Sequence, residues 1–190
     1  MEGTPNNTSI ILSEERLTLL CQQGDQKAQR MLYDRYADQM FRISYRYIKK
    51  EYETEDVLAV GFVKVFKNID RFEYRDKGSL GSWIKRIMIN ESLMYLRKKN
   101  PLNQALDTSE VQIKGGLDSD HELLAQDIYR MVRKLPPGYR TVFNMYVIDG
   151  YTHKEIADFL NVSENTSKSQ LSKARGHLRK MLEKHGIENE

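Results

Sequence analysis

The spacing of apolar residues along the chain predicts an all-α protein. From Gln26, apolar side chains recur every three or four positions over more than twenty residues, which is the period of a long amphipathic helix. Residues that cap helix N-termini, such as Ser13, Asp25 and Ser163, precede several such stretches. The pattern predicts helices over residues 13–22, 26–47, 54–69, 80–100, 123–135, 139–148, 152–160 and from 163 onward.

One segment without helical periodicity divides the chain into two small helical domains. It contains Gly115-Gly116 and four acidic residues against one lysine, a composition that favours a flexible acidic linker. The predicted parts are a loose tail (1–12), a first domain (13–100), the linker (101–121) and a second domain (122–186).

The second domain contains a pattern typical of a helix-turn-helix. Thr152 and Glu155 fit a capping box, Ala157 is small enough for two helices to cross closely, and Ser163 can cap the second helix. The residues predicted to face DNA are Ser163, Asn165, Thr166, Lys168, Ser169, Gln170, Lys173 and Arg175. A recognition helix of this kind enters the major groove with its N-terminal residues near base edges. The alternative is an ordinary helical hairpin with an exposed basic face.

Charge distribution supports nucleic-acid contact more than total charge does. The formal net charge is only +3, but residues 64–100 contain ten basic side chains against four acids, and residues 163–185 contain six against two. Both stretches could meet phosphate groups. Each could equally be a solvated helix face.

The sequence contains no pattern of an enzyme, a metal site or a membrane protein. Cys21 is the only cysteine, and the four histidines show no metal-ligand spacing: His121, His153, His177 and His185. Glycine-rich phosphate loops and nucleophile elbows are also missing. We therefore expect no catalytic activity, no cofactor and no metal. Because the chain has no signal peptide and no apolar stretch of membrane-spanning length, we expect a cytoplasmic protein without membrane insertion.

Several short motifs, in order, resemble one known family. In the first half they are Gly24-Asp25, Leu32-Tyr33, Glu55-Asp56-Val57, Phe62-Val63-Lys64-Val65-Phe66 and Ser82-Trp83-Ile84. In the second half they are Leu135-Pro136, Gly150-Tyr151-Thr152, Glu155-Ile156-Ala157 and Ser163-Glu164-Asn165-Thr166. In order and spacing they resemble bacterial RNA polymerase sigma factors of the sigma-70 superfamily, of the extracytoplasmic-function (ECF) type.

The resemblance implies a sigma factor that directs promoter-specific transcription initiation and has no chemistry of its own. The first domain, like sigma region 2, would bind the clamp coiled coil of core RNA polymerase and the −10 element, and assist promoter melting. The second domain, like sigma region 4, would bind the −35 element and the polymerase flap. Promoter DNA and core polymerase are the implied partners, and many relatives are also held by an anti-sigma factor. We expect a monomer when the protein is free.

The resemblance also assigns residues of the first domain. Melted promoter DNA is single-stranded, and a basic groove with aromatic surfaces suits unstacked bases. The predicted −10 residues are Tyr74, Arg75, Asp76, Lys77, Ser79, Lys85, Arg86 and Asn90. The predicted polymerase-binding residues are Asp56, Ala59, Val60, Val63, Lys64 and Lys67, with Ala59-Val60 where the family often has Gln-Glu. We expect Trp83 to pack in the core and Tyr74 to be exposed.

A stand-alone transcriptional regulator is the main rival interpretation. Such a protein would use the helix-turn-helix on a duplex operator, and would usually dimerise to bind two half-sites. It would need no long basic helix with an aromatic loop in its first domain. Co-purification with core polymerase distinguishes the two functions.

Overall fold

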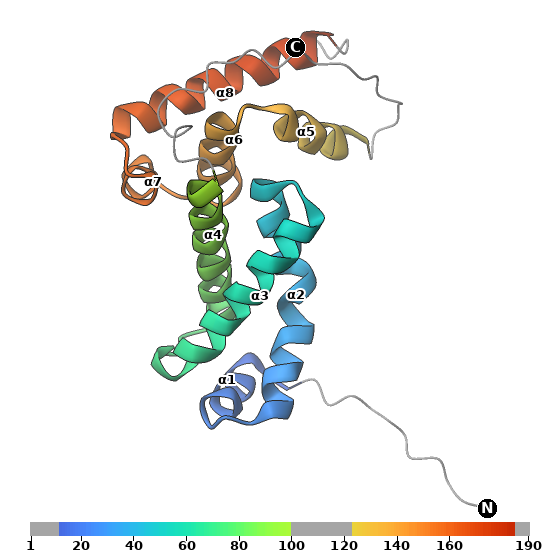
Figure 1. The fold of residues 1–190 in the computed structure, drawn as a ribbon, viewed down its shortest axis with the longest axis vertical. Coiled ribbons are helices and arrows are strands. Elements are labelled where there is room, and N and C mark those ends of the chain that lie inside the picture. The colour runs from blue at the N-terminus through green and yellow to red at the C-terminus, as the bar shows by residue number, and fades with distance from the viewer. Residues whose placement is uncertain (1–11, 100–122, 185–190) are drawn as a thin grey trace, which may run out of the picture.

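The computed structural model describes residues 12–99 and 123–184, and within the second range it describes side chains from residue 128 onward. The regular elements in these ranges are all helical. Figure 1 shows two groups of helices, one above the other, with the last helix lying across the top. The predicted linker at 101–121 and the tail before Leu12 lie outside the described residues. Within the described ranges, no helix combines the length and apolar character needed to cross a membrane.

The first domain is a bundle of three long helices with a short helix at one end. Its elements are α1 (Glu14–Gln22), α2 (Gln26–Ile48), α3 (Glu51–Asn68), the 3-10 turn η1 (Ile69–Arg71) and α4 (Ser79–Lys99). Helices α2, α3 and α4 pack against one another in all three pairs. A Cβ atom on Gly61 of α3 would lie 2.3 Å from Met88 Sδ of α4, so glycine permits this close approach.

The helix starts of the first domain follow the predicted caps, with one exception. Ser13 Oγ accepts a hydrogen bond from Arg16 N at 3.2 Å, and Asp25 Oδ1 accepts one from Ala28 N at 3.0 Å. The prediction that the third helix begins at Thr54 is wrong, because α3 begins at Glu51. Thr54 is buried, and its hydroxyl donates to Lys50 O at 2.7 Å, one turn earlier.

The second domain consists of α5 (Leu123–Lys134), α6 (Pro137–Phe143), the π-helical turn η2 (Asn144–Ile148), α7 (His153–Leu160) and α8 (Glu164–Lys184). Helices α6 and α7 pack on α8. The predicted single helix over 139–148 is wrong in two respects. It begins at Pro137, since proline is favourable in a first helical turn, and it widens at Asn144, where Asp149 N donates to Asn144 O at 2.9 Å.

Candidate nucleic-acid interface

The helix-turn-helix is formed by α7, a tight turn and α8. The predicted capping box is confirmed: Thr152 Oγ1 accepts from Glu155 N at 3.2 Å, and Glu155 Oε2 accepts from Thr152 N at 2.9 Å. The bond from Thr152 N, and then a bond from the Thr152 hydroxyl to the same oxygen, lower the pKa of the Glu155 carboxyl. Asn161 has a φ of 54°, the left-handed conformation that ends α7 and turns the chain into α8.

The recognition helix α8 buries one face and exposes another. Ser163 Oγ accepts from Thr166 N at 3.0 Å, which confirms the predicted cap. Leu171 and Ala174 are buried. Further along the helix Met181 is buried, whereas Leu178 and Leu182 are half-buried.

Most of the residues predicted to contact the −35 element lie on the exposed face of α8 or at its start. Those that are exposed are Ser163, Asn165, Lys168, Ser169, Lys173 and Arg175. Thr166 and Gln170 are half-buried, and the Gln170 side chain lies against Gly138 of α6. Lys168 forms an ion pair with Glu164 one turn away, at 3.7 Å.

A polar contact between α7 and α8 was not predicted from the sequence. Ser167 is fully buried in the first turns of α8, and its Oγ lies 2.9 Å from His153 Nδ1. The His153 ring stacks on Tyr146, with 4.4 Å between ring centroids. A buried hydroxyl needs a hydrogen-bond partner, so this histidine fixes where the recognition helix sits.

The loop before α4 and the first residue of that helix carry five of the eight predicted −10 residues, from Tyr74 to Ser79. Arg75, Asp76 and Lys77 are exposed, whereas Tyr74 is half-buried and thus less exposed than predicted. Ser79 Oγ donates to Asp76 O at 2.7 Å and closes the turn.

Helix α1 anchors this loop through two side chains. The sequence pattern did not predict this anchoring. Glu14 Oε2 accepts from Gly78 N at 2.6 Å, and its other oxygen accepts from Tyr36 OH at 2.7 Å. Gln22 Nε2 donates to Phe72 O at 2.8 Å. Trp83 is half-buried and packs on the core and on Phe72, with centroids 4.9 Å apart, as expected for a packing role.

Two of the predicted −10 residues on α4, Lys85 and Arg86, contact the second domain. Lys85 Nζ lies 2.8 Å from Asp149 Oδ1. The Arg86 guanidinium lies 5.8 Å from the centre of the Phe159 ring, and Arg97 Nη2 donates to Phe159 O at 2.7 Å. Asn90 is half-buried further along the helix.

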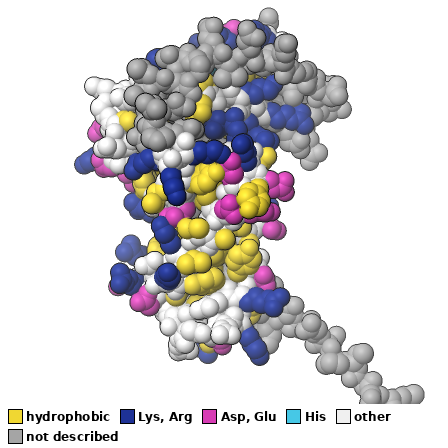
Figure 2. All heavy atoms as spheres, viewed as in Figure 1, with side chains coloured by type: hydrophobic (Ala, Val, Ile, Leu, Met, Phe, Trp, Pro, Cys, Tyr) yellow, Lys and Arg dark blue, Asp and Glu magenta, His cyan; other side chains and the backbone are white. Residues whose placement is uncertain are grey.

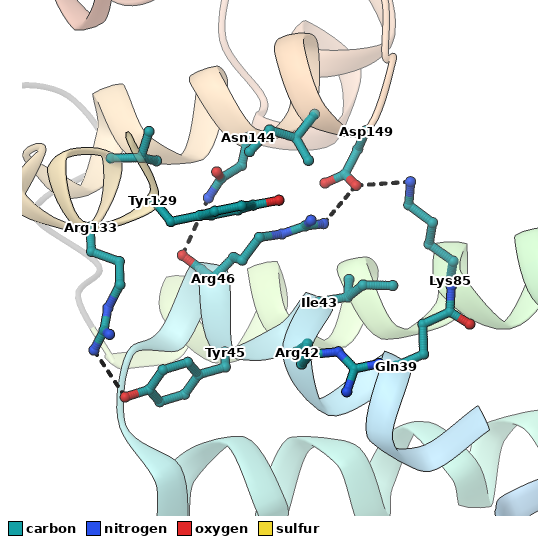
Figure 3. Close-up of a pocket in the computed structure, with 12 residues that line it drawn as sticks. Gln39, Arg42, Ile43, Tyr45, Arg46, Lys85, Tyr129, Arg133, Asn144 and Asp149 are labelled. Carbon is teal, nitrogen blue, oxygen red and sulfur yellow. Dashed lines mark hydrogen bonds and ion pairs between the residues drawn. The ribbon is translucent and has the colours of Figure 1, made fainter. Parts of the chain in front are cut away.

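Asp149 is the centre of this domain junction (Figure 3). Its side chain has no exposed surface, and Oδ1 accepts from Arg46 Nη2 and from Lys85 Nζ, both at 2.8 Å. Its Oδ2 accepts from Tyr47 OH at 2.5 Å. Burial first, and the Asp149 charge second, raise the pKa of the Tyr47 hydroxyl well above its usual value.

The rest of the junction is rich in cations. A cavity of about 530 Å³ lies beside Asp149, and Arg42 and Arg133 are among its lining residues. Arg140 is almost fully buried, and its Nη2 donates to Tyr47 O at 3.2 Å. Burial, then the charge of Arg133, lower the pKa of Arg140 to about 10. In Figure 2, Lys and Arg side chains gather where the two domains meet.

The predicted polymerase-binding residues follow the outer face of α3. Val60 and Val63 are about half exposed, at 50% and 51%. Asp56, Ala59 and Lys67 are exposed, whereas Lys64 is half-buried and forms an ion pair with Glu91 at 2.7 Å. Figure 2 shows hydrophobic side chains between charged ones on the face of the first domain. An exposed apolar strip of this kind suits a protein partner.

Side chains that suit a metal ion do not converge in the part of the chain that the structure describes: no group of three His, Cys, Asp or Glu residues could hold one. Cys21 is buried, and burial raises the pKa of its thiol to about 11, which keeps it in the unreactive thiol form.

Comparisons with known proteins agree with this arrangement. Residues 32–101 match the family Sigma-70 region 2, and residues 125–178 match the family Sigma-70, region 4. The chain is 32% identical to the ECF RNA polymerase sigma factor SigW of Bacillus subtilis, over 84% of this chain and 91% of SigW. It is 25% identical to the ECF RNA polymerase sigma-E factor of Haemophilus influenzae, over 86% of this chain and 92% of the relative.

Two solved structures share the fold. The sigma factor RpoE in complex with the anti-sigma factor NepR, from Bartonella quintana, aligns with a TM-score of 0.51 and 20% identity, over 81% of this chain and 96% of RpoE. CnrH in complex with the cytosolic domain of CnrY aligns with a TM-score of 0.50 and 20% identity, over 88% of this chain and 96% of CnrH. With a region 2 domain, a region 4 helix-turn-helix and this similarity to SigW, the chain belongs to the ECF RNA polymerase sigma factors.

Proposed function

We propose that this chain binds core RNA polymerase and directs it to promoters by contacting the −35 element with α8 and the −10 element with the loop before α4. The observation that carries this proposal is the exposed face of α8. Its polar and basic side chains start at the Ser163 cap, while the opposite face packs on α6 and α7. This is the geometry with which a recognition helix enters the major groove.

Three surfaces would make the contacts with promoter DNA and with the polymerase. Asn165, Ser169 and Lys173 would lie near base edges, with Lys168 and Arg175 on phosphates. The loop around Tyr74–Lys77, which α1 holds in place, would receive unstacked bases of the melted −10 element. The exposed face of α3 around Val60 and Val63 would bind the polymerase clamp.

The proposal includes no catalysis by this chain and places it with the polymerase in the cytoplasm. An anti-sigma partner is a further element of the proposal, since both structural neighbours were solved with other proteins bound: RpoE with the anti-sigma factor NepR, and CnrH with the cytosolic domain of CnrY.

Transcription in vitro tests the function. Core polymerase with this protein should initiate from a subset of a randomised promoter library, and the selected sequences should share two elements separated by a spacer. Core polymerase alone is the control. Tight binding to duplex operator DNA without any interaction with polymerase would instead support the stand-alone regulator.

A substitution on α3 tests the polymerase contact. Val63→Asp should weaken association with core polymerase at least about tenfold, because a charge would replace a half-exposed apolar contact. Leu19→Asp is the matched control, since Leu19 is 44% exposed on α1. Equal loss in both variants would argue against the α3 surface.

A further inference from the structure

Asp149 is held in the manner of a bound anion. Its carboxylate accepts hydrogen bonds from Arg46, Tyr47 and Lys85, and no part of its side chain reaches solvent. Two cations and a hydroxyl thus surround one negative charge. The Nε of Arg46 is also buried and has no hydrogen-bond partner among the described residues. The site therefore has more donor capacity than one carboxylate uses.

All three donors belong to the first domain, whereas Asp149 belongs to the second. Arg46 and Tyr47 lie in the last turn of α2, and Lys85, one of the predicted −10 residues, lies on α4. A phosphate offers the same charged oxygen acceptors as a carboxylate, and Arg, Lys and Tyr side chains are common donors to the phosphates of nucleic acids.

We propose that Arg46, Tyr47 and Lys85 form a binding site for a backbone phosphate of promoter DNA, which Asp149 occupies while the two domains are packed together. This inference rests on the proposed function, since it takes promoter DNA as the ligand. Asp149 and the phosphate use the same donors, so they exclude each other. DNA binding at this site requires the second domain to leave α4, and Asp149 acts as an intramolecular competitor of DNA.

The surrounding contacts make Asp149 the residue that determines whether the two domains stay packed together. The same packing engages Arg86 and Arg97 of α4 with Phe159, although both side chains remain exposed. Among the twelve residues that line the junction cavity, Asp149 is the one acid. The buried guanidinium of Arg140 donates to the backbone carbonyls of Leu135 and Tyr47. Without Asp149, the junction would bring cations together with no compensating charge.

Removal of the carboxylate charge tests the competition. Asp149→Asn should bind a labelled forked promoter DNA about tenfold more tightly in the absence of polymerase, because a larger fraction of molecules is open. Its affinity should also fall more steeply with salt, by about one unit in the slope of log K against log salt. Asp158→Asn is the matched control, since Asp158 is an exposed acid on α7 and its replacement changes the net charge equally.

Second substitutions test whether the added DNA affinity of Asp149→Asn arises at the proposed phosphate site. Arg46→Gln or Lys85→Gln in the Asp149→Asn background should cancel most of the added affinity and the added salt dependence. A gain that persists in both double variants would overturn the phosphate site. An Asp149→Asn variant that is folded by circular dichroism and binds DNA no better than wild type would also overturn it.

Wild-type protein provides a measurement that does not depend on the variant folding. Energy transfer between dyes at the exposed positions Asp38 and Lys180 reports domain separation. Transfer should fall as labelled DNA binds, and bound DNA that leaves transfer unchanged would contradict the proposal. If wild type initiates transcription with core polymerase while these tests fail, this inference alone is wrong and the proposed function stands.

Discussion

The two helices proposed to meet DNA, α4 and α8, differ in what covers them. The part of α8 up to Arg175 exposes Lys168, Lys173 and Arg175 to solvent. On α4, Lys85 pairs with Asp149, and Arg86 lies on the Phe159 ring. One surface is therefore open, and the other is engaged by the neighbouring domain.

The difference shows two ways of preparing a basic surface. The geometry of α8 depends on features nearby in the sequence. These are the Ser163 cap, the Thr152–Glu155 capping box and the buried side chains of Leu171 and Ala174. The state of α4 depends instead on Asp149, which is more than sixty positions away in sequence from Lys85. A −35 contact of this kind is preorganised, whereas a −10 contact depends on the separation of the domains.

The largest expected effect comes from charge reversal on the open helix. Lys168→Glu or Arg175→Glu should abolish −35-dependent transcription, with a loss of at least about tenfold, because each replaces a phosphate-neutralising charge with a repelling one. Run-off transcription on a matched promoter measures it. Lys180→Glu, exposed on the C-terminal half of α8, is the control. Wild-type output from the first two variants would show that α8 does not carry the −35 contact.

A second test concerns the loop before α4. Replacement of Tyr74, Arg75 and Asp76 with alanine should change the preferred −10 sequence, because these residues belong to the loop that is proposed to receive melted bases. Binding to core polymerase should be unchanged, since the exposed face of α3 lies elsewhere. Selection from a randomised −10 library and a polymerase pull-down give the two readouts. Loss of polymerase binding would contradict the assignment.

A smaller effect is expected at the contact between α7 and α8. His153→Phe should leave the buried Ser167 hydroxyl without its partner, at a cost of about 1–3 kcal/mol in the free energy of unfolding. It should also relax −35 selectivity, because α8 would lose a fixed contact near its DNA-facing end.

His153→Asn is the rescue variant, since an amide nitrogen can replace Nδ1. Adding Ser167→Ala to His153→Phe should recover part of the stability, and a double-mutant cycle measures this coupling. Strictly additive effects would show that the two side chains do not act together.

Local signals explain how much of the fold was predictable. Helix caps at Ser13, Asp25 and Ser163 depend on residues within four positions, and the structure confirms them. The predicted start of the third helix was wrong because tertiary packing outweighs the local sequence signal there. Thr54 resembles a cap in the sequence, but it is buried inside a helix that starts at Glu51.

The same limit applies to the site. The exposure of Lys168 and Arg175 followed from helical period, because the opposite face had to pack. The junction could not be predicted, since Asp149-Gly150 reads in sequence only as the end of a helix. Its role depends on contacts with Arg46 and Lys85, which are distant in sequence. The anchoring of the −10 loop by α1 is hidden from local patterns for the same reason.

The smallest expected effect is a pH dependence at the covered junction. Burial, then the charges of Arg140 and Arg133, lower the pKa of Lys49 from 10.5 to about 8. Above about pH 8 the folded protein releases this proton while the unfolded chain still holds it, so stability should rise with pH until about pH 10. The raised pKa values of Cys21 and Tyr47 oppose the rise from about pH 9 and about pH 10 upward, because the folded state resists the ionisation of both groups.

Urea unfolding at about pH 7.5 and about pH 9.5 measures this increment. Lys49→Met should remove it, whereas Lys27→Met, at an exposed position of α2, should retain it. Arg140 and Arg133 belong to the second domain, so part of the shift exists only while the domains are packed. The increment should therefore shrink in Asp149→Asn. If it does not, the charge of Asp149 is not what keeps these cations against Lys49, and the contrast between an open α8 and a covered α4 has another cause.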